Sequence, residues 1–371
     1  MTAGAPVAAD LDRSPSRHPL LAPRALAERA LGGLEALLPT LGAILVSLAL
    51  FGAFVGAAGH SPLAVYAEMY RGAFGTWFSV QNSLLRAAPL MLTGLCTALP
   101  ARLGLIVIGG EGALVMGGLA AAAAAIPLQG SPPALVIAGM MLASMLVGAL
   151  WVGAAGALRV LRGVNETISS LLLAYIGIAL FNHLVEGPLR DPASLNKPST
   201  LPIGDANLLP NLPGLDVHWG LAFGVIACIA AHVAMEHSVF GFAARMVGGN
   251  PRAARLSGLH VARLVILTCA LGGAAAGLAG MVEVAAIHGK ANASLLAGYG
   301  YAGILVAFLA GHNALAILPV AVLLGGIGAS GGLLQRTFGL PDAAVNVLQG
   351  ILFVVLLGSQ TYRGRLRLRR S

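Results

Sequence analysis

Charged residues of both signs are scarce in this sequence. Its 371 residues include 14 Asp and Glu and 22 Lys and Arg, so that charged residues make up 10% of the chain. Soluble globular domains carry charge on about 25% of their residues. Here 57% of the residues are hydrophobic instead. This balance excludes a soluble domain and predicts an all-α polytopic membrane protein.

Lysine is almost absent, and with it the phosphate-binding motif of ATPases. That motif needs a glycine-rich turn ending in Gly-Lys followed by Ser or Thr. The one lysine that follows a glycine, Lys290, precedes Ala291. The chain is therefore not expected to be an ATPase. Its formal charge of +8 comes from arginines in short loops and tails. Basic residues placed in this way are typical of the loops that set the orientation of a membrane protein, and they do not indicate a nucleic-acid-binding surface.

Clusters of cysteine, histidine and carboxylate residues are missing as well. Cys96, Cys228 and Cys269 lie in apolar segments, are odd in number and have no metal-ligand spacing, so we expect buried thiols and no disulfide framework. The histidines lack spacings such as HExxH, and no His/Asp/Ser constellation is evident. We therefore expect no metal site and no catalytic residues, although a membrane-embedded enzyme stays as an alternative.

Proton-driven pumps carry relays of Asp, Glu and His within their spans, and this chain lacks a dense relay. A sodium-coupled secondary transporter remains open, because a carrier with broken helices can coordinate its ion through backbone carbonyls. Energy for any transport then comes from a partner or from a hidden ion site.

Apolar windows of membrane-crossing length, about 17–25 residues, organise the rest of the chain. We predict a cytoplasmic tail at residues 1–35, a transmembrane domain at 36–358 and a basic cytoplasmic tail at 359–371. The second, third, eighth and ninth windows are short or interrupted by glycine, which predicts broken or re-entrant helices. The ten windows lie near residues 37–58, 84–100, 103–126, 134–157, 166–185, 218–236, 264–287, 298–311, 313–330 and 344–358.

Arginine placement favours an even number of spans with both termini in the cytoplasm, because cytoplasmic loops carry the excess of basic residues. In that topology the cytoplasmic side holds Arg13, Arg17, Arg24, Arg29, Arg102, Arg159, Arg162, Arg245, Arg252, Arg255, Arg263, Arg363, Arg365, Arg367, Arg369 and Arg370. The other side holds Arg71, Arg86, Arg190, Arg336, Lys197 and Lys290.

Glu111 is a carboxylate inside an apolar window, between Gly109-Gly110 and Gly112. A charged side chain at the centre of a membrane helix costs about 2.5–3.5 kcal/mol on insertion scales, so Glu111 is expected to face the bundle interior or water. It lies either at a broken helix on a solute path or at a helix contact that it fixes. Glu283 lies toward the end of its window, and we interpret it as structural.

Two other segments have local signatures. Asn165 and Glu166 open the fifth window, where an Asn N-cap followed by Glu in the first turn indicates a helix start. Residues 245–263 form an arginine-rich loop in which Asn250 and Pro251 predict a short helix presented to a soluble partner. The proline-rich loop 186–217 is expected outside, either as a docking site for a solute-delivering partner or as a solvated connector.

Six ordered segments carry a family resemblance that covers most of the chain. They are GLIVIGGEGALVMGGL at Gly104–Leu119, RGVNETISSLLLAYI at Arg162–Ile176, EGPLRDP at Glu186–Pro192, GGNPRAARLSGL at Gly248–Leu259, GGAAAGLAGMVEV at Gly272–Val284 and GYGYAGILVAFLAGHN at Gly298–Asn313. Together they resemble the permease subunits of ATP-binding-cassette importers in the branched-chain amino acid, ribose and nucleoside superfamily, within its nucleoside or simple-sugar group.

The resemblance implies a type II importer-like permease in a bacterial cytoplasmic (inner) membrane. Two permease chains, identical or merely similar, would alternate between outward and inward access. ATPase subunits would bind ATP and Mg, and an extracytoplasmic solute-binding protein would deliver the solute. The resemblance assigns coupling to the ATPase to Gly248, Asn250, Pro251, Arg252, Ala253, Ala254, Arg255 and Gly258. It makes pathway candidates of Gly110, Glu111, Asn165, Glu166, Tyr175 and Tyr299.

Departures from the family pattern concern the solute more than the fold. Val107, Ala113 and Ala174 stand where the family commonly has Asn, Gln and Asn, so three amides are missing along expected solute-facing segments. Ala314, by contrast, replaces a usual proline, and this departure concerns the fold more than the solute. We expect a nucleoside or a simple sugar as solute, with branched-chain amino acids or another small polar solute as the alternative.

Overall fold

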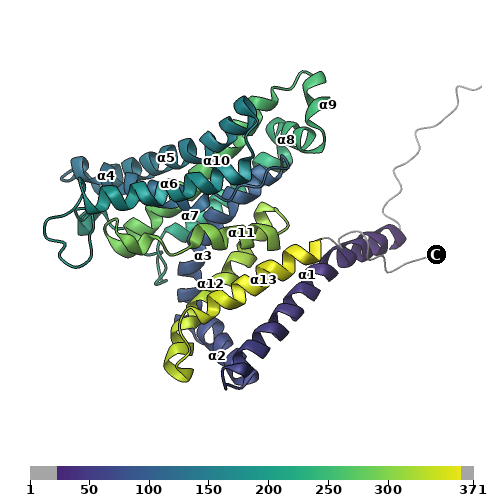
Figure 1. Cartoon of the computed structure of the whole chain (residues 1–371), viewed down its shortest axis with the longest axis horizontal. Coiled ribbons are helices and arrows are strands. Elements are labelled where there is room, and N and C mark those ends of the chain that lie inside the picture. The colour runs from purple at the N-terminus through teal and green to yellow at the C-terminus, as the bar shows by residue number, and fades with distance from the viewer. Residues whose placement is uncertain (1–22, 361–371) are drawn as a thin grey trace, which may run out of the picture.

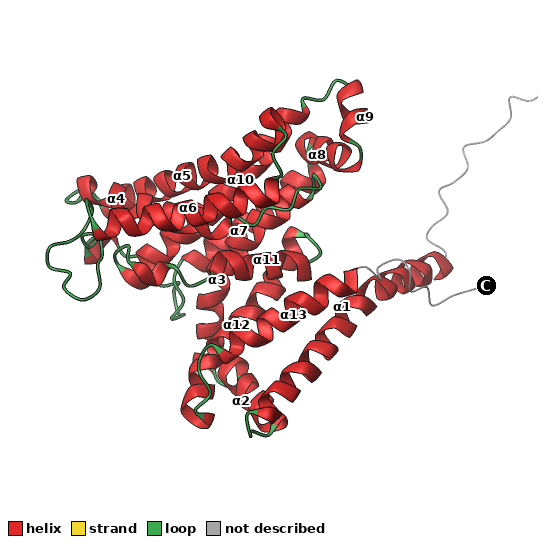
Figure 2. Ribbon diagram, viewed as in Figure 1, coloured by secondary structure: helices red, strands yellow, loops and turns green. Residues whose placement is uncertain are grey.

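The computed structural model describes residues 23–360, with side-chain environments from residue 40 to residue 359. Over this range the chain folds into thirteen α-helices joined by loops, short 3-10 turns and one π-helical segment. Figure 2 shows red helices joined by green loops, with no strand in the described chain. Two isolated β-bridges are the only extended pairing among these residues. The predicted all-α fold is confirmed.

Eight helical segments of the described chain are long and apolar enough to cross a membrane. Their helices are α1 (Pro23–Ala57), α3 (Trp77–Ala101), α4 (Gly110–Ala125), α5 (Pro133–Arg162), α6 (Glu166–Glu186), α7 (Gly220–His237), α10 (Val261–Val282) and α12 (Ala314–Phe338). Two shorter apolar helices, α11 (Tyr299–Leu309) and α13 (Ala344–Gln360), occupy the eighth and tenth predicted windows. Every predicted window therefore coincides with a helix.

Three helices do not correspond to a predicted window: α2 (Pro62–Phe74), α8 (Val239–Gly249) and α9 (Pro251–Leu256). Each is shorter than the windows that define a span, so hydropathy alone does not reveal it. In addition, α1 begins at Pro23, inside the segment 1–35 that the sequence assigns to a tail. The rest of that tail, and residues 361–371 of the C-terminal tail, lie outside the described residues.

Two groups of helices flank a central helix α3 (Figure 1). On one side α10 packs against α5, α4 and α3, and on the other α12 packs against α3 and α2 while α1 packs along α13. Glycine permits the closest crossings. A Cβ on Gly148 of α5 would lie 2.2 Å from the carbonyl oxygen of Gly273 on α10, and a Cβ on Gly117 of α4 would lie 2.4 Å from Cα of Gly277. The backbones of these helices thus touch directly, as small residues allow in lipid.

The two ends of the bundle carry different structures. Helices α8 and α9 lie together at one end, at the upper right of Figure 1. At the other end, the loop between α6 and α7 is attached by backbone hydrogen bonds to the segment that follows α10. The amides of Thr200, Ile203 and Leu209 donate to the carbonyls of Ala291, Gly289 and Ala285 at 3.0, 2.9 and 2.9 Å, respectively.

Candidate functional site

Helices α4 and α11 both begin inside the bundle, after stretches without helix. Residues 105–108 have no regular structure before α4, and Gly298, with φ of +81°, precedes α11. The two N-termini meet at Gly300, where a Cβ would lie 2.2 Å from the backbone nitrogen of Glu111. Only glycine therefore fits at position 300 without moving one of the two helices.

Glu111 joins these two helix starts. One carboxylate oxygen accepts the backbone N–H of Gly298 at 2.9 Å, and the other accepts the N–H of Gly300 at 2.6 Å. The first turn of a helix leaves N–H groups without intrahelical partners and carries a positive dipole end. Glu111, which is 1% exposed, satisfies that need for α11 from the first turn of α4.

A cavity of about 900 Å³ opens beside this junction. Its walls come from α3, the stretch before α4, α6, α11, α12 and α13, and they are mainly apolar. Five polar side chains also line it: Arg86, Tyr299, Tyr301, Asn346 and Gln349. Ligand sites commonly combine an apolar wall with a few polar groups that fix orientation, so this cavity is the best candidate site in the described chain.

Arg86 is the cation of the cavity. A span that starts at residue 84 predicts Arg86 near the outer surface, but α3 begins at Trp77, where Thr76 caps it by accepting the N–H of Ser79. Arg86 is therefore more than two turns inside the helix. Arg86 lines the cavity, and no carboxylate of the described side chains lies within 4.0 Å of its guanidinium group.

The sequence-based pathway candidates occupy different places. Tyr299 lines the cavity, whereas Gly110 and Glu111 form its supporting junction. Asn165 caps α6 by accepting the N–H groups of Thr167 and Ile168 at 2.9 and 3.1 Å, as the sequence predicts.

The other two candidates also lie off the cavity wall. Glu166 pairs with Arg159, with 3.3 Å between Oε2 and Nε. Tyr175 is 58% exposed on α6 and does not line the cavity. Of the six candidates, Tyr299 alone forms part of the wall.

Four polar lining residues were not among the sequence-based pathway candidates: Arg86, Tyr301, Asn346 and Gln349. Arg86 could have been found as a charge within an apolar helix, had the helix been started at Trp77. Asn346 and Gln349 are spaced three residues apart on α13, which places both on one face of that helix. No sequence pattern distinguishes Tyr301 from Tyr299, because both tyrosines stand in the same short motif.

The predicted coupling segment contains the short helix α9. Asn250 caps it by accepting the N–H groups of Arg252 and Ala253 at 3.0 and 3.1 Å, and Pro251 is its first residue. Ala254 is buried, whereas Arg252 and Arg255 are exposed. Gly258 has a φ of +83°, and Gly248 packs by its backbone against Arg102. The predicted role of this segment in coupling stays a prediction.

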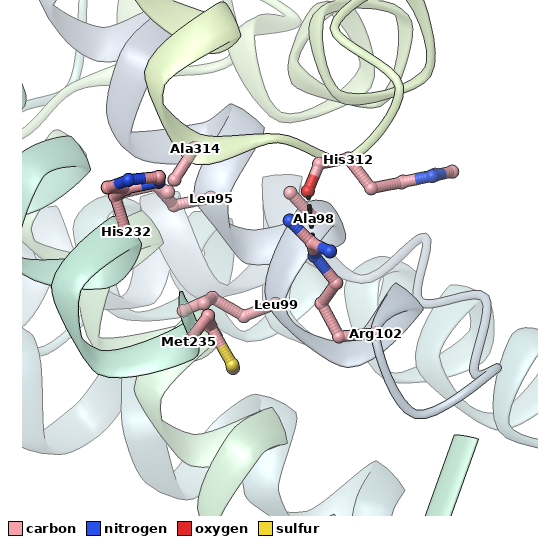
Figure 3. A pocket seen from close by; sticks show the side chains of 8 residues that line it. All are labelled: Leu95, Ala98, Leu99, Arg102, His232, Met235, His312 and Ala314. Atoms are coloured by element: carbon pink, nitrogen blue, oxygen red, sulfur yellow. Dashed lines mark hydrogen bonds between the residues drawn. The ribbon is translucent and has the colours of Figure 1, made fainter. Parts of the chain in front are cut away.

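A polar network lies near α8, and its Arg102 and His312 line a small pocket at the end of α3 (Figure 3). Arg102 donates from Nε to the carbonyl oxygen of His312 at 3.2 Å and from a terminal nitrogen to Glu236 at 2.8 Å. The second carboxylate oxygen of Glu236 accepts from Arg245 at 3.2 Å. Residues of α3, α7, α8 and the turn after α11 are thereby joined.

Comparisons with known proteins bear on what this arrangement does. Residues 79–357 match the family described as branched-chain amino acid transport system, permease component. The chain is 33% identical to a glucose ABC transporter permease of Haloferax volcanii, over 86% of this chain and 87% of the relative. It is 28% identical to a guanosine ABC transporter permease of Bacillus subtilis, over 89% and 95%. A nucleoside ABC transporter permease of Lactococcus lactis is 26% identical, over 80% and 84%.

Proposed function

Because this chain belongs to the permease component family of branched-chain amino acid transport systems, we propose that it is the transmembrane subunit of an ATP-driven importer of nucleosides or simple sugars. It is a multi-pass ABC transporter permease of the nucleoside and sugar group. The observation that carries the proposed function is the cavity of about 900 Å³ beside the junction of α4 and α11.

The lining of the cavity suits a hydroxylated solute with a ring. Its volume lies within the range of about 300–1,000 Å³ found for small-molecule sites. Arg86, Asn346 and Gln349 supply hydrogen-bond donors for ring or ribose hydroxyls, and the two amides also supply acceptors. Tyr299 and Tyr301 offer aromatic rings for a nucleobase or a sugar face. Relatives named for glucose and for guanosine support both solute classes.

Transport would proceed by alternating access between two permease chains, either two copies of this one or this one with a similar partner. The ATP and Mg would be bound by separate ATPase subunits, since the chain lacks a P-loop. Helix α9 would seat in a groove of the ATPase. Its exposed cations, Arg252 and Arg255, and its rigid capped geometry support that role.

The proposed orientation places both termini in the cytoplasm of a bacterial cell, with the protein in the inner membrane. Helices α8 and α9 and the Arg102 network would face the cytoplasm, in keeping with the bias of basic residues toward that side. The attached loop between α6 and α7 would face outward and receive the solute-binding protein. Hydrogen bonds from this loop to Ala285, Gly289 and Ala291 give a docking partner a firm surface.

The family description itself favours a second candidate solute, a branched-chain amino acid. A carboxylate of such a solute would pair with Arg86. Competition separates the two solute classes: guanosine or glucose is expected to be taken up, and excess leucine is expected not to reduce that uptake. Uptake of leucine with no uptake of guanosine or glucose would favour the amino acid.

Affinity purification from the native membrane, followed by mass spectrometry, tests the assembly. We expect a P-loop ATPase, one or two permease chains and a solute-binding protein in the purified complex. If the chain purifies alone and moves solute in liposomes under a sodium gradient, the importer proposal gives way to an ion-coupled secondary transporter.

A further inference from the structure

Arg102 connects helices that lead, in one direction, to α9 and, in the other, to the cavity. It lies just after the C-terminus of α3 and donates to Glu236 on α7 at 2.8 Å. Glu236 in turn accepts from Arg245 on α8 at 3.2 Å. Helix α8 continues through Asn250 directly into α9. These two ion pairs therefore connect α8, the helix next to α9, to the end of α3.

Backbone packing reinforces the same connection. Gly248, near the end of α8, lies so close to Arg102 that a Cβ on it would be 2.3 Å from the Arg102 carbonyl oxygen. A shift of α8 toward α3 would push on this contact, and a shift away would pull on the pair formed by Arg245 and Glu236. Movement of α8 in either direction would thus reach Arg102.

On its other side, Arg102 holds the turn between α11 and α12. Its Nε donates to the carbonyl oxygen of His312 at 3.2 Å, as the dashed line in Figure 3 shows. His312 has a φ of +59° and is the one residue other than glycine with positive φ in the described chain. Such a conformation is costly for a residue with a Cβ and persists where the surroundings hold it.

Helix α11 spans the distance from this turn to the cavity. Its eleven residues, Tyr299–Leu309, make a rod of roughly 16 Å at 1.5 Å per residue. The far end carries Tyr299 and Tyr301 of the cavity wall and is tied by Gly298 and Gly300 to Glu111. A short rigid helix fixed at both ends transmits a displacement of one end to the other.

We propose that Arg102 is a positioning residue that transmits movement of α8 and α9 to α11, and so sets the position of the cavity wall at Tyr299. The proposal rests on the proposed function, since it takes the ATPase as the source of the movement. Arg102 touches neither solute nor nucleotide in this scheme. It acts through the His312 turn and through Glu236.

If Arg102 only stabilised the fold, its variants would lose stability and assembly, and the response of the cavity to nucleotide would not be affected separately. The paired side chains are partly open to solvent, at 27% for Arg102, 32% for Glu236 and 41% for Arg245. Ion pairs of this exposure contribute little to stability. Variants of the network are therefore expected to fold and assemble, and their defect is expected in the response of the cavity to nucleotide.

The test uses the intact complex purified from its native membrane and a reporter cysteine at position 297. Ala297 lines the cavity and is exposed, whereas the three native cysteines are buried. The rate at which a hydrophilic maleimide modifies Ala297→Cys is measured without nucleotide and after trapping with ATP and vanadate. ATP hydrolysis is measured in the same preparations. The chain that lacks Ala297→Cys gives the background labelling.

Trapping is expected to change the labelling rate of the parent reporter by roughly fivefold or more, because coupling between sites shifts equilibria by about 5–150-fold and the labelling rate follows the population in which position 297 is accessible. Adding Arg102→Gln or the isosteric Glu236→Gln is expected to reduce that change to less than about twofold, with ATP hydrolysis retained. Arg102→Lys is expected to fall between, because it keeps the charge facing Glu236 but loses the fork that also reaches His312. Arg162→Gln is the control, because Arg162 is exposed and has no described partner within 4.0 Å.

The outcomes separate the two levels of the argument. A parental response that both Arg102→Gln and Glu236→Gln retain in full overturns the role of Arg102 and leaves the importer in place. An equal loss in Arg162→Gln also overturns it, because the effect would then follow any lost cation at this end. A complex without an ATPase overturns the proposed function and this inference with it, whereas a parent complex that contains its ATPase but whose labelling ignores nucleotide overturns this inference alone.

Discussion

The carboxylate of Glu111 accepts the backbone N–H of Gly300 at 2.6 Å across 189 positions of sequence. This contact holds together two helices that each begin inside the bundle. It places the positive end of α11, with its two tyrosines, at the wall of the cavity. The proposed transport mechanism requires that this junction stays intact while α11 moves.

Replacing the carboxylate tests the junction directly. In Glu111→Gln one amide oxygen can still accept an N–H group, but the amide nitrogen faces the second N–H as a donor. We expect uptake to fall by about tenfold, as for loss of a charge-assisted hydrogen bond, and to fall less in Glu283→Gln. Uptake of radiolabelled guanosine or glucose in proteoliposomes is the measurement. If both Glu111→Gln and Glu283→Gln retained the uptake of the parent, the carboxylate of Glu111 would be dispensable for transport.

Glycine at position 300 is expected to be needed for full stability. A Cβ in Gly300→Ala would lie 2.2 Å from the Glu111 nitrogen, whereas Gly332 on α12 has nothing within 4 Å of its Cβ position. Overpacking of this kind costs about 1–3 kcal/mol. Thermal unfolding in detergent should therefore shift down for Gly300→Ala and stay near the parent for Gly332→Ala. Equal melting temperatures would contradict the close approach of α4 and α11.

Arg86 is expected to contribute to solute binding. Arg86→Gln removes a charged donor from the cavity, and hydrogen bonds to charged groups are worth about 1.5–3 kcal/mol. The KM for uptake should rise by roughly tenfold or more, with the amount of assembled complex unchanged. Arg336→Gln is the control, because Arg336 is exposed on α12 and does not line the cavity. A KM that is unchanged in Arg86→Gln would remove Arg86 from the site.

The cations of α9 are expected to be needed for coupling. Arg252 and Arg255 are exposed and make no described ion pair, so reversing both charges leaves the fold of the chain intact. The double change Arg252→Glu with Arg255→Glu should abolish uptake and release the ATPase from the purified complex, while the chain still inserts in the membrane. Unaltered uptake would refute the assignment of α9 as the coupling helix.

Acid is expected to weaken the loop between α6 and α7. Burial lowers the pKa of His218 from 6.5 to about 4, so the unfolded chain binds a proton that the folded chain does not. Folded stability is complete above about pH 6.5 and falls as pH drops toward 4, by on the order of 1–2 kcal/mol at pH 5.

The check on this prediction compares melting temperatures at pH 7.5 and pH 5.0 in the parent and in His218→Asn. The acid-induced decrease should be smaller in the variant, since asparagine does not titrate. A decrease of the same size in both proteins would show that other groups cause it.

Hydropathy in the sequence predicted the long helices well, because a membrane imposes both length and composition on them. It missed α2, whose thirteen residues fall short of a span, and it placed the start of α3 seven residues late. That error moved Arg86 from the cavity to the surface. The local capping signals at Asn165 and Asn250 were sound, since an N-cap depends on residues only a few positions apart.

Contacts between distant segments could not be predicted in the same way. The glycines around Glu111 indicated a broken helix, but its partner Gly300 lies 189 positions away. The sequence predicts the loop after α6 as an external docking site or a solvated connector. The loop is held by backbone bonds to residues 285–291, which no side-chain pattern encodes. The Arg102 network likewise depends on how the ends of α3 and α7, the middle of α8 and the turn after α11 meet.

ATP-dependent uptake by the purified complex tests the central claim most directly. The complex is placed in proteoliposomes, with Mg-ATP on the ATPase side and the solute-binding protein on the opposite side. Radiolabelled guanosine or glucose is then added. The account predicts accumulation of one of them that requires ATP, stops with vanadate and does not depend on a sodium or proton gradient. Accumulation that follows an ion gradient and continues without ATP would contradict it.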